Sequence, residues 1–218
     1  MCSTKKAPTQ TADNLEETFQ TNHLGPLYLT LLLLEELKQN SPSRIIMVSS
    51  ELHDPTTQFR SGPDAHLDFE NLMLNSKEGK FSGMLAYKNT KLANVLFSKE
   101  LSRRLPAKSD VTINSMNPGW IPMTGLIVAS SCFKIFLGCC FGCCFTKTAS
   151  LDSSSNCLVH LSCSDSLEGV TGKYYDQCRE ISSSSESNDE NVALQLWDAS
   201  VKLLNIENEK CVQDLSRS

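Results

Sequence analysis

The chain has 218 residues, which is long enough for one domain with a sizeable core and short for two. Its 20 basic and 25 acidic residues give a net charge of -5, which argues against nucleic acid as a main partner. The N-terminal residues do not resemble a signal peptide. We interpret the ten cysteines as reduced thiols of a protein in the cytoplasm or at the cytosolic face of an intracellular membrane.

The hydropathy pattern predicts an alternation of helices and apolar strands. The expected elements are a helix over 13–39 capped by Asp13, a strand over 44–50, a long polar connection over 51–80, a helix over 84–104, a strand over 111–116, a helix over 146–163, a short strand over 172–175, a serine-rich loop over 182–187 with a solvated serine run over 182–185, and a helix over 188–204. This order is typical of a doubly wound α/β sheet. Neither apolar stretch, 24–34 or 121–145, predicts a membrane-spanning helix, whereas peripheral contact with a membrane stays open.

Tyr87 and Lys91 lie one turn apart in the helix predicted over 84–104. Side chains at positions i and i+4 project from the same helical face. A cation beside a phenol favours the phenolate, which makes Tyr87 a candidate proton donor or acceptor for a carbonyl/alcohol couple. The Tyr-x-x-x-Lys spacing also arises often by chance, so the assignment depends on the surrounding residues.

Ser49 and Ser50 end the strand predicted over 44–50, at the edge where open α/β sheets bind ligands. A hydroxyl at this edge could hold a substrate oxygen beside the phenol. Asn22 precedes that strand, and Pro26, four residues later, has no N–H for the Asn22 carbonyl. Two interpretations follow for that carbonyl: it holds a water leading towards the ammonium, or it marks a structural kink only.

These residues lie in four segments, LEETFQTNHLGPLYLT, RIIMVSSELH, AYKNTKLANVLFSKELSRRL and VTINSMNPGW. In this order the segments resemble the short-chain dehydrogenase/reductase family. They are similar to the subgroup that contains the retinol dehydrogenases and the WW-domain-containing oxidoreductase. The resemblance covers residues 12–126 closely and continues weakly to about residue 205.

The resemblance implies a catalytic role for four positions. Asn22 would be the water-holding member of a catalytic tetrad. Ser50, rather than Ser49, would polarise the substrate carbonyl, because this subgroup places its serine second in the pair. Tyr87 would be the general acid/base, and Lys91 would bind the nicotinamide ribose and lower the pKa of the phenol.

The same resemblance implies a nicotinamide cofactor, NADP or NAD. Tyr87 and Lys91 would contact its ribose, and Ile121 and Thr124 its carboxamide, although many relatives place the contacting threonine where this chain has Met123. The family's glycine-rich loop, T-G-x-x-x-G-x-G, does not occur in the sequence. We therefore expect a partial Rossmann-like, doubly wound parallel α/β sheet, the C-terminal portion of the fold without its first strands. Residues 1–218 would form one truncated domain that binds the cofactor weakly.

The function implied by the resemblance is that of an NAD(P)-dependent oxidoreductase. It would interconvert a small lipophilic alcohol, such as a retinoid or steroid, with its carbonyl compound. The alternative is a catalytically inactive fragment or isoform that acts, if at all, as an interaction module. The sequence does not indicate an oligomeric state.

Residues 120–150 are apolar and rich in cysteine. In this subgroup the segment forms a lid over the substrate, and an apolar lid suits a lipophilic alcohol. The spacing of Cys139, Cys140, Cys143 and Cys144 also matches zinc ligands, but the surrounding apolar residues favour buried thiols or an apolar flap, and we expect no metal site. Three histidines are interpreted as surface or packing residues: His53, His66 and His160.

Overall fold

The computed structural model describes residues 7–57, 62–74, 81–106, 109–119, 121 and 150–215. Four strands form one sheet: β1 (Ser43–Val48), β2 (Val111–Asn117), β3 (Tyr174–Asp176) and β4 (Arg179–Ile181), in that spatial order. β1, β2 and β3 are mutually parallel, and β4 returns antiparallel to β3. The predicted parallel α/β sheet is confirmed for three strands. The fourth strand, which is three residues long and follows a tight turn, was not predicted, because its residues show no apolar run.

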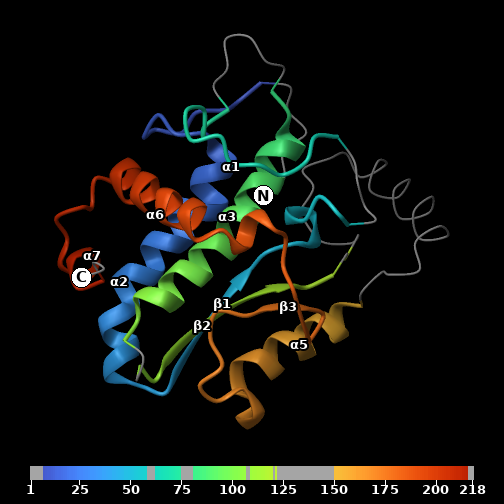
Figure 1. Ribbon diagram of the computed structural model, residues 1–218, viewed down its shortest axis with the longest axis vertical. Coiled ribbons are helices and arrows are strands. Elements are labelled where there is room, and N and C mark those ends of the chain that lie inside the picture. The colour runs from blue at the N-terminus through green and yellow to red at the C-terminus, as the bar shows by residue number, and fades with distance from the viewer. Residues whose placement is uncertain are drawn as a thin grey trace.

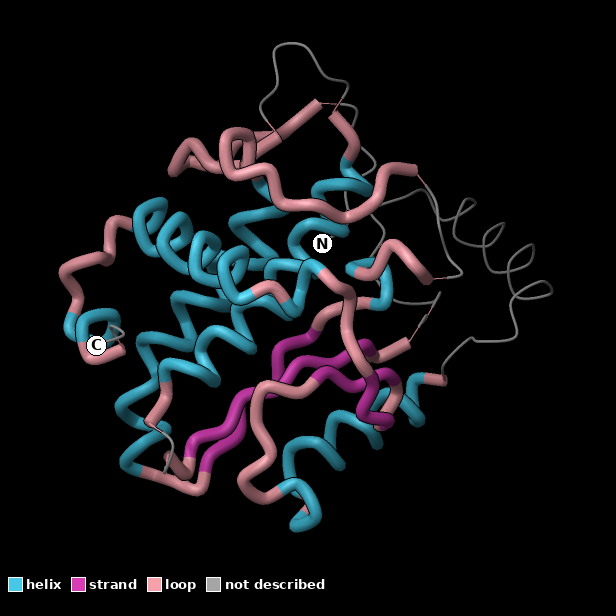
Figure 2. The backbone as a smooth tube through the Cα atoms, viewed as in Figure 1, coloured by secondary structure: helices cyan, strands magenta, loops and turns pink. Residues whose placement is uncertain are grey.

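Helices cover both faces of the sheet, as expected for a doubly wound fold (Figure 1). On one face lie α2 (Gly25–Gln39), α3 (Gly83–Arg104) and α6 (Glu190–Leu204), and on the other lies α5 (Leu151–Cys163). The tube view shows the strands running between these two layers (Figure 2). Shorter elements complete the described chain: α1 (Glu17–Phe19), the π-helical η1 (Gln20–Leu24), η2 (Glu51–His53), η3 (Asp165–Leu167), η4 (Glu186–Asn188) and α7 (Lys210–Gln213). None of the described helices combines the length and apolar composition that a bilayer-spanning segment needs.

The start of the first helical stretch differs from the prediction. The stretch begins at Glu17, and its cap is the Glu16 carboxylate, which accepts from the Phe19 N–H at 2.7 Å. Asp13 is therefore not the cap; its carboxylate accepts from the Gln20 amide at 2.6 Å. The reason is a turn at Asn14, whose φ of 60° interrupts helical geometry between Asp13 and the helix.

The helical stretch widens into a π-helix before Pro26. The Gly25 N–H donates to the Gln20 carbonyl, five residues earlier, instead of closing a regular α-turn. Pro26 has no N–H, so the Asn22 carbonyl cannot accept from the residue four positions later, as it would in a regular α-helix.

The central helix α3 is buried along most of its 22 residues. Leu101 is fully buried in a core cluster with residues of α2, α6 and the sheet, and Leu92 and Leu96 are fully buried in a second cluster with Phe19, Leu24 and residues of α6. The same burial withdraws polar side chains of α3 from water, and a buried polar group needs a hydrogen-bond partner to offset its lost hydration. The partners of these side chains define the candidate site.

The serine-rich segment 182–187 is only partly solvated, so the prediction of a solvated serine run over 182–185 was wrong for Ser183 and Ser184. Ser183, Ser184 and Ser187 are 8%, 4% and 1% exposed. The Ser187 hydroxyl donates to Ser183 Oγ at 2.6 Å, and Lys99 of α3 donates to the same Ser183 oxygen at 2.7 Å. Buried serine hydroxyls can form hydrogen bonds to one another and to the backbone in place of bonds to water, so a polar composition does not by itself predict exposure.

Candidate active site

Tyr87 and Lys91 project from the same face of α3, as their spacing predicts. The Lys91 ammonium lies 5.4 Å from the centroid of the Tyr87 ring. Tyr87 is 5% exposed and Lys91 is 9% exposed, so both groups are withdrawn from bulk water. A cation held against a phenol in low-dielectric surroundings acts on that phenol more strongly than it would on the surface.

The Lys91 turn of α3 is attached to the end of β1 by two hydrogen bonds. Lys91 Nζ donates to the main-chain carbonyl of Val48 at 3.1 Å. The Ser49 hydroxyl donates to the main-chain carbonyl of Lys91 at 2.7 Å. Burial lowers the pKa of Lys91 to about 8, so the side chain is still mainly an ammonium at neutral pH.

The two serines after β1 have different environments. Ser49 is 2% exposed, and its hydroxyl is committed to α3. Ser50 is half-buried and caps η2, where its hydroxyl oxygen accepts from the Leu52 N–H at 3.3 Å. The hydroxyl hydrogen of a serine that accepts in this way can still donate to a substrate oxygen. This difference supports Ser50 over Ser49 as the substrate-facing serine.

Asn22 connects the π-helical turn to α3. Its carbonyl accepts from the Asn94 side-chain amide at 3.1 Å, and its own amide donates to Thr90 Oγ1 at 3.2 Å. The carbonyl to which Pro26 cannot donate is therefore bound by a side chain. A carbonyl oxygen has two lone pairs, so a water molecule can bind it as well.

Asn94 and His23 belong to the site and were not singled out from the sequence. The Asn94 amide also donates to the Val48 carbonyl at 3.3 Å, beside the bond from Lys91. His23 Nδ1 lies 3.3 Å from Asn94 Oδ1, and its Nε2 lies 3.0 Å from Ser200 Oγ of α6. The available signal was Asn94 itself, a polar residue inside the apolar run LANVLF.

The His23 ring is neutral. Asn94 Oδ1 can only accept, so Nδ1 carries the proton and Nε2 accepts from the Ser200 hydroxyl. Complete burial lowers the pKa of His23 to about 4. The neutral ring therefore links the site to α6 over a separation of 177 residues.

The end of β2 forms the neighbouring part of the same sheet edge. The Asn117 amide donates to Asp176 Oδ1 at 2.8 Å, and its Oδ1 accepts from the Gly119 N–H at 3.2 Å. Gly119 has a φ of 83°, a conformation that favours glycine. Ile121 follows this turn, whereas Thr124 lies outside the described residues, as do positions 122–149 of the predicted lid.

The described residues fit one end of a nicotinamide cofactor. The buried Lys91 ammonium and the Gly119 turn lie at the carboxyl ends of neighbouring parallel strands, where dinucleotides bind in open α/β sheets. The glycine loop that receives the pyrophosphate in the family has no counterpart in the sequence. The fit is thus limited to the nicotinamide-ribose end.

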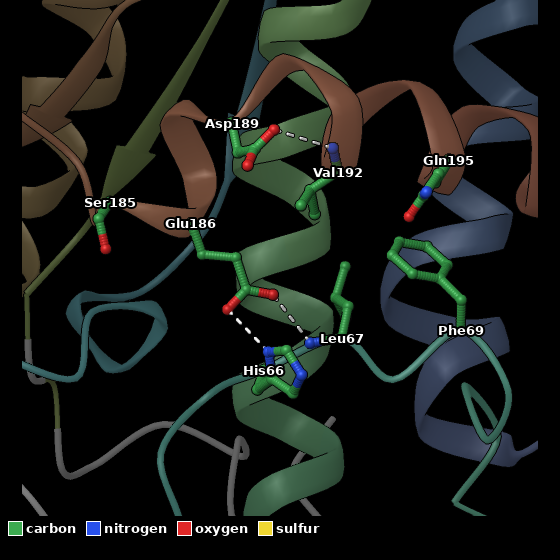
Figure 3. Close-up of a pocket in the computed structure, with 8 residues that line it drawn as sticks. All are labelled: His66, Leu67, Phe69, Ser185, Glu186, Asp189, Val192 and Gln195. Atoms are coloured by element: carbon green, nitrogen blue, oxygen red, sulfur yellow. Dashed lines mark hydrogen bonds and ion pairs between the residues drawn. The ribbon is translucent and has the colours of Figure 1, made fainter.

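A separate cavity of about 490 Å³ lies beside the serine-rich segment (Figure 3). Glu186 accepts there from the Leu67 N–H at 3.0 Å, and its other oxygen lies 3.1 Å from His66 Nδ1. The described lining residues do not include Tyr87 or Lys91; they are His66, Leu67, Phe69, Ser185, Glu186, Asp189, Val192 and Gln195. In the described part of the chain, no three metal-ligating side chains come together, and the Cys139–Cys144 run lies outside that part.

Several named proteins are similar to the chain over most of its length. The WW domain-containing oxidoreductase of Gallus gallus is 38% identical over 89% of this chain and 45% of that protein. Retinol dehydrogenase 14 of Mus musculus is 36% identical over 91% of this chain and 55% of its own length. Retinol dehydrogenase 13 of Homo sapiens is 37% identical over 90% of this chain and 56% of its own length.

Over about 90% of its length the chain is thus similar to members of the short-chain dehydrogenase/reductase family. It spans about half the length of the curated relatives it matches. A solved structure of an uncharacterized protein from Mycobacterium paratuberculosis matches 91% of this chain and 62% of that chain, with a TM-score of 0.62 and 26% identity. No protein-family model matches the chain.

Proposed function

We propose that this chain carries the proton-transfer site of an NAD(P)-dependent oxidoreductase. The observation that carries the proposal is the buried Lys91 ammonium, 5.4 Å from the Tyr87 ring and bonded to the Val48 carbonyl at the end of β1. Ser50 follows Val48 by two residues and keeps a half-buried hydroxyl. A phenol, an ammonium and a hydroxyl at one sheet edge suit proton transfer to and from an alcohol oxygen.

The nicotinamide, when bound, supplies or accepts the hydride at the substrate carbon. In the reducing direction, Tyr87 donates its phenolic proton to the carbonyl oxygen, which becomes the alcohol oxygen. The Ser50 hydroxyl donates a hydrogen bond to that oxygen and orients it. The Lys91 ammonium stabilises the phenolate left on Tyr87, and a water on the Asn22 carbonyl completes the route by which the proton is replaced.

The proposed substrate is a lipophilic alcohol or aldehyde of retinoid or steroid type. Support for this class comes from the relatives that are named retinol dehydrogenases. The apolar segment 120–150 suits such a substrate as its lid. A cytoplasmic location, or one at the cytosolic face of an intracellular membrane, is part of the proposal, and the described cysteines are free thiols, which fits a reducing compartment.

A second candidate function is that of an interaction module without catalysis. An exposed apolar patch on α2 favours it: Leu29, Leu32 and Leu33 are 58%, 54% and 45% exposed, and Val48 at the described edge of the sheet is 43% exposed. Apolar surface of this kind is typical of a contact with another protein surface. In this case the Tyr-Lys pair would remain as an unused part of the fold.

Calorimetry and turnover separate the two candidates. The 218-residue chain is titrated with NADPH and then assayed with NADPH and all-trans-retinal, following the loss of nicotinamide absorbance. Saturable binding together with turnover that Tyr87→Phe abolishes supports the enzyme. A folded chain that neither binds NADPH nor reduces retinal excludes the enzyme for this chain and leaves the interaction module.

A further inference from the structure

His53 is buried directly behind the serine of the candidate site. The side chain is 1% exposed, and its ring packs against Tyr174 with a centroid distance of 4.7 Å and an interplanar angle of 60°. Its Nδ1 lies 2.7 Å from the Ser50 carbonyl oxygen, and its Nε2 lies 3.3 Å from the Ser184 main-chain nitrogen. The sequence-based interpretation of His53 as a surface or packing residue accounts for the ring stacking only.

The two hydrogen bonds assign one protonation state to the ring. A carbonyl oxygen can only accept and a main-chain N–H can only donate. Nδ1 is therefore protonated and donates to the Ser50 carbonyl oxygen, and Nε2 is unprotonated and accepts from the Ser184 N–H. A charged ring, or the opposite tautomer, would place a hydrogen on Nε2 against the Ser184 N–H.

His53 donates two hydrogen bonds to the Ser50 carbonyl oxygen. Its own main-chain N–H donates to that oxygen at 3.2 Å, in addition to the bond from Nδ1 at 2.7 Å. The carbonyl is thereby fixed on the side of Ser50 that leads into η2. The hydroxyl of the same residue, which accepts from the Leu52 N–H, is fixed relative to it.

The opposite end of the ring connects Ser50 to α3 by a second route. Ser184 adjoins Ser183, whose hydroxyl accepts from Lys99 of α3 at 2.7 Å. The first route is the bond from Ser49 to the Lys91 carbonyl, two turns earlier in the same helix. The serine pair is thus connected by two routes to α3, the helix that carries Tyr87 and Lys91. His53 forms the link between Ser50 and Ser184 in the second route.

We propose that His53, as the neutral Nδ1–H tautomer, is the positioning residue that holds Ser50 in register with Tyr87. The inference rests on the proposed function for its catalytic meaning, because it extends the same site by one residue behind the serine. The hydroxyl that orients a substrate oxygen works only at a defined distance from the proton donor, and a displacement of about 1 Å can lower the rate by about 100-fold.

The ring state can be measured without any turnover. Long-range proton–nitrogen correlation spectra of the chain, labelled with ¹⁵N histidine, separate the two neutral tautomers and the charged form at pH 7.5. We expect the signals of His53, assigned by loss in His53→Asn, to show the Nδ1–H tautomer. The Nε2–H tautomer or a charged ring at this pH would overturn the proposal.

Two substitutions divide the roles of the ring nitrogens. In His53→Asn the side-chain amide reaches the place of Nδ1 and can still donate to the Ser50 carbonyl. In His53→Gln the longer side chain reaches the place of Nε2 and can still accept from Ser184. His160→Asn, an exposed histidine of α5, is the matched control.

The positioning role predicts different results for the two substitutions. We expect His53→Asn and the control to retain kcat within about 3-fold, and His53→Gln to lose about 10- to 100-fold in kcat with the NADPH KM unchanged. The amide NMR signal of Leu52 should move in His53→Gln and stay in His53→Asn. Equal losses of kcat in both variants, or an unmoved Leu52 signal in both, would refute the positioning role. An inactive wild-type chain would instead refute the proposed function, with the tautomer and the Leu52 signal still deciding the geometry.

Discussion

The ammonium of Lys91 donates to the main-chain carbonyl of Val48 at 3.1 Å, which joins the middle of α3 to the last residue of β1. The side-chain amide of Asn94 reaches the same carbonyl at 3.3 Å. Two donors from successive turns of one helix thus meet at the point where the chain leaves the sheet. Because the two serines follow at once, this junction sets where the phenol, the ammonium and the hydroxyl meet.

Tyr87→Phe tests the proton-transfer role directly. The substitution removes one oxygen from a residue that is 5% exposed and keeps the ring, so packing is conserved. We expect kcat to fall by at least about 100-fold, the range given for the loss of a general acid/base. Turnover of retinal with NADPH is the measurement. Tyr175→Phe is the control, since its buried hydroxyl has no partner among the described residues and its loss should leave kcat unchanged.

Lys91→Met should make the chain more stable while abolishing turnover. Burial lowers the pKa of Lys91 from 10.5 to about 8, so the unfolded chain binds the proton more tightly and the unfolding free energy falls as pH drops from 10.5 to 8. At pH 7 the removal of this buried charge should raise the free energy of unfolding by about 3 kcal/mol, and the lost hydrogen bond to the Val48 carbonyl should lower it by about 1 kcal/mol. Urea unfolding should therefore show a net gain of about 2 kcal/mol. A net loss at pH 7 and an equal loss at pH 11 would contradict the burial penalty.

Ser49→Ala should mainly lower the stability of the chain, whereas Ser50→Ala should mainly lower kcat. Ser49 donates to the Lys91 carbonyl from a buried position, so its loss should cost about 1 kcal/mol of unfolding free energy with a smaller effect on kcat. Ser50→Ala should reduce kcat by about 10-fold or more and change the free energy of unfolding by less than about 0.5 kcal/mol. Urea unfolding and retinal turnover are measured for both. If Ser49→Ala had the larger loss of kcat, the choice of Ser50 as the substrate-facing serine would be wrong.

His23 should make the fold sensitive to acid. Its folded pKa is about 4 against an unfolded value of 6.5, so the unfolded chain takes up a proton first as the pH falls. The stability that the neutral ring contributes is complete above pH 6.5 and is lost between pH 6.5 and 4, by about 3 kcal/mol. His23→Gln removes this titration, so its unfolding free energy should change less over the same range. Parallel curves for the two proteins would show that His23 does not titrate as stated.

The sequence by itself determined the features that depend on local spacing. The step of four residues from Tyr87 to Lys91 completes about one helical turn, so the two side chains share a face wherever the helix packs. The apolar run RIIMVSS predicted a strand, and the structure places β1 over Ser43–Val48. Pro26 has no N–H to donate to the Asn22 carbonyl four residues earlier, and this too follows from one residue and its spacing.

Only the tertiary structure decided how the site is supported. Asn94, His23 and His53 act through partners 72, 177 and 131 residues away, and no spacing along the chain predicts such pairs. The serine-rich segment reads as solvated from its composition, yet packing against α3 buries three of its serines. The physical reason is that helix and strand periodicity depends on neighbouring residues, whereas the partner of a buried polar group depends on which segments the folded core brings together.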